Sequence, residues 1–115
     1  MRRLLPLLLL AALPAHASDY SLEIDHSVRG RQLTIVPQLA APAGSRLRYE
    51  MTSTREGGAG QSNSSQSGSV DVGDSGTATL SRLSVSVGPK DRYVVTVKVF
   101  DGAKLVAEDV LRYPQ

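Results

Sequence analysis

The sequence contains neither cysteine nor tryptophan, and its aromatic residues are four tyrosines and one phenylalanine. Without cysteine the chain has no disulfide bond, no cysteine to carry a lipid anchor and no thiol for redox or nucleophilic chemistry. So few aromatic rings also provide little surface on which nucleic-acid bases could stack. The stability of an exported form of this chain must therefore come from packing, without covalent cross-links.

Histidine is also scarce, and only His26 lies outside the N-terminal segment discussed below. Its neighbours Asp25 and Ser27 supply the residue types of a catalytic triad, but adjacent side chains on a strand point to opposite faces. One histidine without cysteine excludes ordinary zinc geometry. Asp71 and Asp74 lack the spacing of an EF-hand loop and are explained by Asx-turns. The sequence therefore predicts no enzyme activity, no metal and no cofactor.

Long hydrophobic runs are absent except at the N-terminus, where Leu4–Leu13 is apolar and broken only by Pro6. This run is too short to span a bilayer. It follows the basic pair Arg2–Arg3 and precedes Ala15–Ala17, which has the A-x-A form of a cleavage site. The pattern predicts a secretory signal peptide over residues 1–17 and a periplasmic or exterior location. An uncleaved N-terminal membrane anchor is the alternative.

An excess of one charge is absent from the predicted mature chain. The full sequence has 13 Lys and Arg against 11 Asp and Glu, and loss of Arg2 and Arg3 leaves 13 − 2 = 11 against 11. A formal net charge of zero gives no support for nucleic-acid binding. Residues 18–115 number 115 − 17 = 98, which suits one domain with one core. Nothing in this range is long and apolar enough to cross a membrane.

The stretch from Arg46 to Val70 has two contrasting halves. In the first half apolar and polar residues alternate, so one set can face a core and the other water. The apolar set is Leu47, Tyr49 and Met51, and the polar set is Arg46, Arg48, Glu50 and Thr52. The second half, Gln61–Ser69, consists of Ser, Gln, Asn and Gly and has almost nothing to bury. We expect a hairpin of one amphipathic and one polar strand.

Period-two alternation recurs along the rest of the chain and predicts seven short strands with no helix. They are expected at 20–25, 33–39, 46–54, about 61–69, 77–83 (with alternation continuing to 87), 92–100 and 104–113. The predicted core includes Leu47, Tyr49, Leu80, Tyr93, Val95 and Val97. Seven short strands at near-regular spacing predict an all-β fold, an immunoglobulin-like seven-stranded antiparallel β-sandwich.

Several residues carry local signals within this pattern. Gly30 and Asp101–Gly102 favour tight hairpin turns. Pro37 lacks a backbone donor, so its strand should end, bulge or lie at an edge there. In the last strand Leu105 and Val110 have opposite parity, which predicts a bulge.

Five blocks of the sequence resemble the curli assembly inhibitor family. They are Arg55–Ser62, Leu80–Val85, Pro89–Arg92, Val95–Val97 and Asp101–Gly102, and they keep their order over most of 46–102. The resemblance implies an immunoglobulin-like sandwich. It also implies a periplasmic chaperone that keeps curli subunits from forming amyloid inside the cell.

The chain departs from the family pattern at one place. Enterobacterial members carry Cys-x-Cys where this chain has Ser45-Arg46-Leu47, so a redox role is excluded and the chain looks closer to cysteine-free alphaproteobacterial members. The implied partner is the curli major subunit, with the minor subunit as a second candidate, and the protein is expected to be a monomer. A passive sandwich module or a minor fibre component remains the alternative function, and a secreted enzyme or metal carrier is disfavoured.

The exposed positions of the predicted strands at 46–54 and 92–100 provide candidate client-binding residues. If those strands pair, Arg46, Arg48 and Lys98 lie near one another on one face. The exposed positions include no large apolar patch, so we expect client contact to be weak, transient and partly electrostatic. A solvated sheet face without binding function is the alternative.

Overall fold

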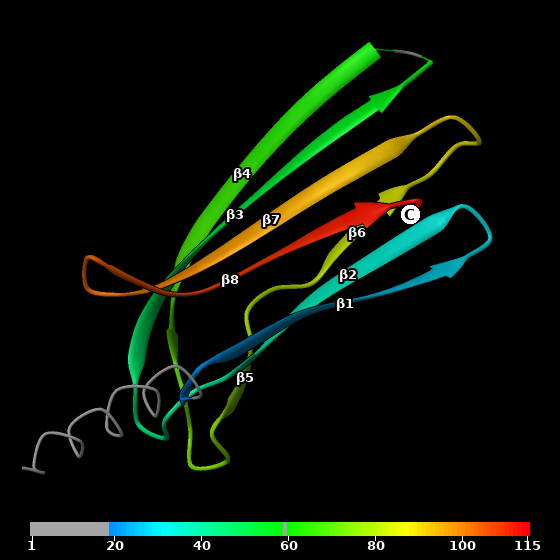
Figure 1. Cartoon of the computed structure of the whole chain (residues 1–115). Helices are drawn as coiled ribbons and strands as arrows, with labels where there is room; N and C mark the ends of the chain where they lie inside the picture. The colour runs from blue at the N-terminus through cyan, green and yellow to red at the C-terminus, as the bar shows by residue number, and fades with distance from the viewer. Residues whose placement is uncertain (1–18, 59) are drawn as a thin grey trace, which may run out of the picture.

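The computed structural model describes residues 19–58 and 60–115 and is all-β (Figure 1). The predicted signal peptide at 1–17 lies outside the described residues. The strands are β1 (Ser21–Arg29), β2 (Gln32–Ala40), β3 (Arg46–Gly57), β4 (Gly60–Asp71), β5 (Thr77–Thr79), β6 (Leu83–Ser86), β7 (Arg92–Asp101) and β8 (Lys104–Tyr113). In this part of the chain no helix is long and apolar enough to span a membrane.

The strands form two antiparallel sheets of four strands each. In one sheet β2 is central and pairs with β1 on one side and with both β5 and β6 on the other. The other sheet has the order β4-β3-β7-β8. Buried apolar side chains from both sheets form one cluster: Ile24, Leu33, Ile35, Leu39, Ala41, Leu47, Met51, Val72, Leu80, Tyr93, Val95, Val97, Val99 and Leu111. Of the predicted core residues only Tyr49 is half-buried rather than buried.

The described residues contain eight strands instead of the predicted seven, because the expected strand at 77–83 is interrupted. Pro37 explains the interruption. Its carbonyl accepts a hydrogen bond from the Leu80 N–H at 3.0 Å, so this side of Pro37 faces the gap between β5 and β6. The ring nitrogen of Pro37 lies on the same side and has no hydrogen to donate. The expectation that the strand ends or bulges at Pro37 was therefore wrong, because β2 continues through it. The expectation of an edge is met locally, because β2 has a strand partner on only one side at Pro37.

The turn and bulge predictions are largely confirmed. Gly30 has a positive φ of 57° in the β1–β2 turn. The β7–β8 turn is displaced by one residue from the prediction, because Asp101 pairs with Lys104 and the turn begins at Gly102. A register shift in the β7–β8 pairing confirms the predicted bulge. Beyond it Leu105 faces outward and is 45% exposed.

The β3–β4 hairpin extends both strands to 12 residues, and Gly57 pairs with Gly60 at its end. Toward this end the inward positions are polar, and the hydroxyls of Ser53 and Ser64 lie 2.7 Å apart. Most of β4 is exposed, as its composition predicts. The fourth strand therefore widens the sheet of β3 without contributing much to the core.

Candidate functional site

The outer face of the β4-β3-β7-β8 sheet brings together the three basic residues that the sequence indicated. Arg46 and Arg48 lie on β3, and Lys98 lies on β7. In the β3–β7 register Arg48 pairs with Phe100 and Glu50 pairs with Lys98. Residues directly opposite each other in an antiparallel pair share a face. The structure therefore places all three on one surface, as expected if these two strands pair.

Both arginines have carboxylate partners on this face. The Arg46 Nε lies 3.1 Å from the Asp71 Oδ1, and their side chains are 80% and 73% exposed. The Arg48 Nη1 lies 2.8 Å from the Glu50 Oε2, and the Arg48 guanidinium also stacks 4.6 Å from the centre of the Phe100 ring. Exposed ion pairs of this kind are weak and screened by salt. Each pair nevertheless places a negative charge beside an arginine, so this surface is less positive than its basic residues alone would make it.

Lys98 on β7 lies between two glutamates on the neighbouring strands β3 and β8. Its register partner on β3 is Glu50, and its partner on β8 is Glu108. Among the ion pairs of the described residues, none within 4.0 Å involves Lys98. The three predicted residues thus belong to a surface of mixed charge, and Lys98 keeps its ammonium group available.

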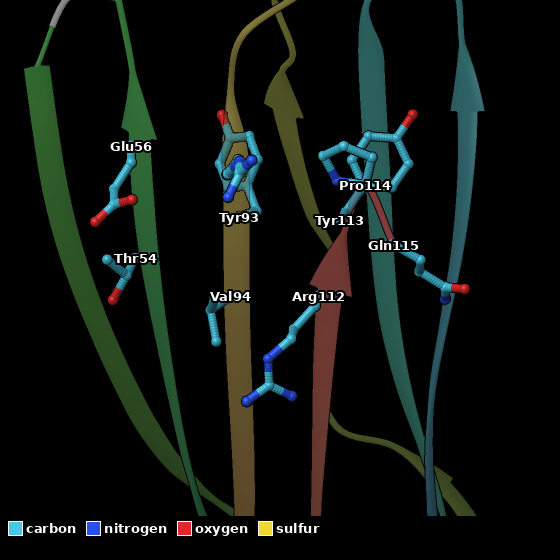
Figure 2. Close-up of a pocket in the computed structure, with 9 residues that line it drawn as sticks. Thr54, Glu56, Tyr93, Val94, Arg112, Tyr113, Pro114 and Gln115 are labelled. Atoms are coloured by element: carbon cyan, nitrogen blue, oxygen red, sulfur yellow. The ribbon is translucent and has the colours of Figure 1, made fainter.

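Two further arginines on the same face were not identified from the sequence. Arg92 and Arg112 line a hollow over β3, β7 and β8, together with Thr54, Glu56, Val94 and the C-terminal residues (Figure 2). Figure 2 shows the Arg112 side chain reaching from β8 toward β7. No ion pair within 4.0 Å involves either arginine in the described chain. Arg92 lies on the same face of β7 as Lys98, so the sequence alternation could have identified it. Arg112 could be placed on this face only from the β7–β8 register, because the bulge changes which residues of β8 face outward.

A partly buried ion pair lies at the edge of the inner face, at the same end of the sheet, with Asp91 buried and the Arg55 side chain 40% exposed. The Arg55 Nη2 lies 3.2 Å from the Asp91 Oδ2, which also accepts a hydrogen bond from the Gly88 N–H at 2.7 Å. The Gly88 N–H lowers the pKa of Asp91 below its ordinary value; burial opposes this shift and the Arg55 guanidinium adds to it. The carboxylate ties the turn before β7 to β3, so its role is structural.

The residue types considered for catalysis do not assemble. His26 lies on the inward parity of β1, opposite Ile35, and its ring makes an edge contact with Tyr113 at 5.9 Å between centroids. Asp25 and Ser27 have the other parity. Across residues 19–58 and 60–115, no group of three or more His, Cys, Asp or Glu is placed to hold a metal ion.

Comparison with known proteins gives consistent matches in sequence. Residues 8–110 match the model of the Tafi-CsgC family, described as thin aggregative fimbriae synthesis protein. Curli assembly protein CsgC of Escherichia coli K12 is 31% identical to this chain over 99 residues, which cover 86% of each protein. The protein of the same name from E. coli O1:K1 has the same identity and coverage.

Comparison of structures gives a similar fold in two solved proteins. The E. coli curli protein CsgC (SeCys) matches with a TM-score of 0.64 at 24% identity, over 84% of this chain and 99% of that one. The solution structure of R. palustris CsgH matches with a TM-score of 0.65 at 20% identity, over 80% and 90%. At these identities the structural matches show likeness of fold.

Proposed function

The chain belongs to the Tafi-CsgC family of thin aggregative fimbriae synthesis proteins, and from this premise we propose that it is a non-enzymatic, chaperone-like inhibitor of curli amyloid. It would keep curli subunits from forming amyloid before they are secreted. The observation that carries the proposal is the family match over 8–110, together with 31% identity to a curli assembly protein over 86% of the chain. Homology supports a curli-related role, and inhibition of assembly is the mechanism that we propose.

The proposal places the protein in the periplasm. The basic pair Arg2–Arg3, the apolar run and the Ala15–Ala17 motif support export and cleavage before Ser18. Mass spectrometry of the protein recovered from a periplasmic extract should give the mass of 18–115. Recovery of the uncleaved chain in the membrane fraction would contradict this location.

We also propose that the fold is immunoglobulin-like. If β5 and β6 are counted as one strand interrupted opposite Pro37, the chain has seven strands in two antiparallel sheets. This agrees with the strand number of the immunoglobulin constant type. The fourth strand differs, because β4 stays with β3 instead of joining the sheet of β1 and β2.

The proposed partner is the curli major subunit, with the minor subunit as a second candidate, bound by a monomer of this protein. Arg46, Arg48 and Lys98 are the proposed contact residues, and Arg92 and Arg112 extend the same face. The exposed apolar residues Val94, Leu105 and Val110 lie on this face among charged side chains, so contact should be brief and only partly electrostatic. Such contact suits an inhibitor that acts below the concentration of its client.

The test is an aggregation assay with purified curli major subunit. The folded protein, added at a small fraction of the subunit concentration, should lengthen the lag before fibres form. An unrelated cysteine-free β-sandwich of similar size provides the control. If the protein has no effect even at equimolar ratio, the proposal is wrong. If it sediments with the fibres without delaying them, it is instead a minor fibre component.

A further inference from the structure

The two sheets present four outer edges, and three of them are protected against pairing with another chain. An unprotected edge exposes a row of main-chain donors and acceptors. On one sheet β5 and β6 have only 3 and 4 residues and are separated by a gap. Short, interrupted strands of this kind offer little length for pairing.

The edges of β1 and β8 protect each other. The Ile24 N–H on β1 donates a hydrogen bond to the Asp109 Oδ2 on β8 at 3.1 Å. Asp109 lies on the inward parity of β8, where a charged side chain opposes the addition of a strand. The bulge in the β7–β8 pairing and the charged residues Lys104, Glu108 and Arg112 interrupt this edge further.

The outer edge of β4 has none of these features that protect an edge from pairing with another chain. The strand is 12 residues long, which corresponds to about 40 Å, and it pairs with β3 in continuous register from Gly60 to Asp71. Its other side pairs with no strand of the described chain. Proline is absent from it, no register shift interrupts it, and residues 60–70 include no charged side chain.

The side chains of β4 indicate what such an edge could accept. Between Gln61 and Ser69 they are hydroxyls and amides, with Gly68 as a gap, and nearly all are exposed. Amide side chains form ladders between adjacent strands of matching chemistry. No large side chain imposes one register, so the strand can accept different segments in different registers.

A second copy of this protein fits the edge less well than an unfolded client does. A stable interface buries about 800 Å² on each partner around an apolar core. Residues 60–69 of β4 contribute no apolar side chain, so pairing here would rest on hydrogen bonds, mainly of the main chain, without an apolar core. That is suited to transient capture of an extended segment.

We propose that the outer edge of β4 is a strand-capture surface, which pairs by main-chain hydrogen bonds with an extended, uncharged client segment rich in Gln, Asn, Ser and Gly. This rests on the proposed function for the identity of the client, an amyloid-forming curli subunit. A captured strand follows the twist of this sheet, whereas strands in amyloid stack flat and in register. Capture therefore holds the segment away from the geometry that fibre growth requires.

The experiment compares two variants that each gain three lysines at outward-facing strand positions. The edge variant carries Asn63→Lys, Ser65→Lys and Ser67→Lys on β4. The inner-strand variant carries Gln32→Lys, Thr34→Lys and Gln38→Lys on β2, the central strand of the other sheet, away from β4 and from the proposed basic contact face. Both gain the same charge, so general electrostatic attraction changes equally. Circular dichroism and thermal unfolding establish that both are folded.

In the curli-subunit assay, we expect the edge variant to extend the lag at least threefold less than the wild type does. We expect the inner-strand variant to extend the lag as much as the wild type does. In parallel, amide hydrogen exchange of the wild type is measured by NMR with and without the subunit in its unfolded form. Amides of 61–71 that point away from β3 should exchange more slowly in its presence. Protection on β7 or β8 alone would overturn the proposal.

The remaining outcomes separate this inference from the proposed function. If the wild type delays fibres but the edge variant is as active and the β4 amides are unchanged, edge capture is wrong and the proposed function stands. If the wild type fails to delay fibres yet its β4 amides are protected by the subunit, the proposed function is wrong and edge capture stands. Protection of β4 that rises with protein concentration and needs no client would show pairing of two copies, which overturns capture of a client.

Discussion

Arg55 and Asp91, 36 residues apart in the sequence, join the end of the β3–β4 hairpin to the turn that begins β7 through an ion pair of 3.2 Å. The Gly88 N–H donates to the same carboxylate oxygen at 2.7 Å. Gly57 packs against the other side of the carboxylate, since a Cβ built there would overlap the Asp91 Oδ1. Four residues from two separate segments of the sequence therefore serve one structural contact.

Substitution of Gly57 tests how tightly this contact is packed. Gly57→Ala should lower the free energy of unfolding by about 1–3 kcal/mol, because the added methyl group displaces the Asp91 carboxylate. Gly58→Ala is the matched control, because a Cβ there meets nothing within 4 Å. Urea unfolding of the three proteins measures the difference. Equal destabilisation by both substitutions would show that loss of glycine flexibility, and not the carboxylate, is responsible.

The Asp91 carboxylate should also make stability depend on acid pH. The Gly88 N–H, supported by Arg55, lowers the pKa of Asp91 in the folded state relative to the unfolded value near 3.8. A lowered folded-state pKa stabilises the protein above the unfolded pKa, and this contribution is lost as pH falls through the folded pKa. Asp91→Asn should therefore be less stable than wild type at pH 7, with the difference shrinking below about pH 4. Thermal melts from pH 2 to pH 7 measure it, and a pH-independent difference would contradict the assignment.

Tyr93 connects the core to the end of β6 through its hydroxyl, which donates to the Ser86 carbonyl at 2.7 Å. Tyr93→Phe should cost about 1 kcal/mol of unfolding free energy by removing this hydrogen bond.

Burial raises the pKa of Tyr93 above 10.0, with Arg55 opposing and Asp91 adding to the shift. Stability due to this raised pKa is present below about pH 10 and is lost as pH rises through the folded pKa. Absorbance at alkaline pH should show one tyrosine that ionises later than the rest, and its persistence in Tyr93→Phe would contradict this.

The alternation on β7 predicts that two substitutions three residues apart differ greatly in their effect on stability. Val95 is completely buried, whereas Lys98 faces outward. Val95→Asp should unfold the domain, since an unpaired buried carboxylate costs several kcal/mol against a total stability of about 5–15 kcal/mol. Lys98→Ala should change stability by less than about 0.5 kcal/mol. Circular dichroism distinguishes them, and a folded Val95→Asp protein would mean that the facing of β7 is wrong.

Charge reversal on the outer face tests the proposed electrostatic contact. In the curli-subunit assay, the lag before fibres form should be shorter with the triple variant Arg46→Glu, Arg48→Glu and Lys98→Glu than with the wild type. The wild-type effect should also weaken in high salt, because surface charges are screened over about 8 Å at physiological ionic strength. The curli subunit alone is measured at each salt concentration as the control.

A second charge variant distinguishes the two parts of this face. Arg92→Glu with Arg112→Glu alters the hollow in Figure 2 and leaves the Arg46–Asp71 and Arg48–Glu50 pairs intact. We expect a larger loss of inhibition per substitution from this double variant, since neither arginine has a carboxylate within 4.0 Å in the described residues. If both folded variants inhibit as well as wild type at every salt concentration, the outer face is only a solvated surface.

The sequence alone determined the features that depend on neighbouring residues. Period-two alternation correctly gave the facing of Val95 and Val97 and the full extent of the last strand, 104–113. It also predicted the bulge, because Leu105 and Val110 differ in parity. These succeed because the side chains of a strand alternate by covalent geometry, wherever its partners lie.

Only the tertiary structure decided the features that depend on register between distant strands. Pairing of β2 with its neighbours placed Pro37 opposite the gap that divides β5 from β6. Pairing of β3 with β4 and β7 brought Asp71 to Arg46, and Glu50 to Lys98. Which basic side chains stay available, and which edge stays unpaired, follow from these long-range hydrogen-bond ladders, because a shift of one residue would exchange every neighbour on the face.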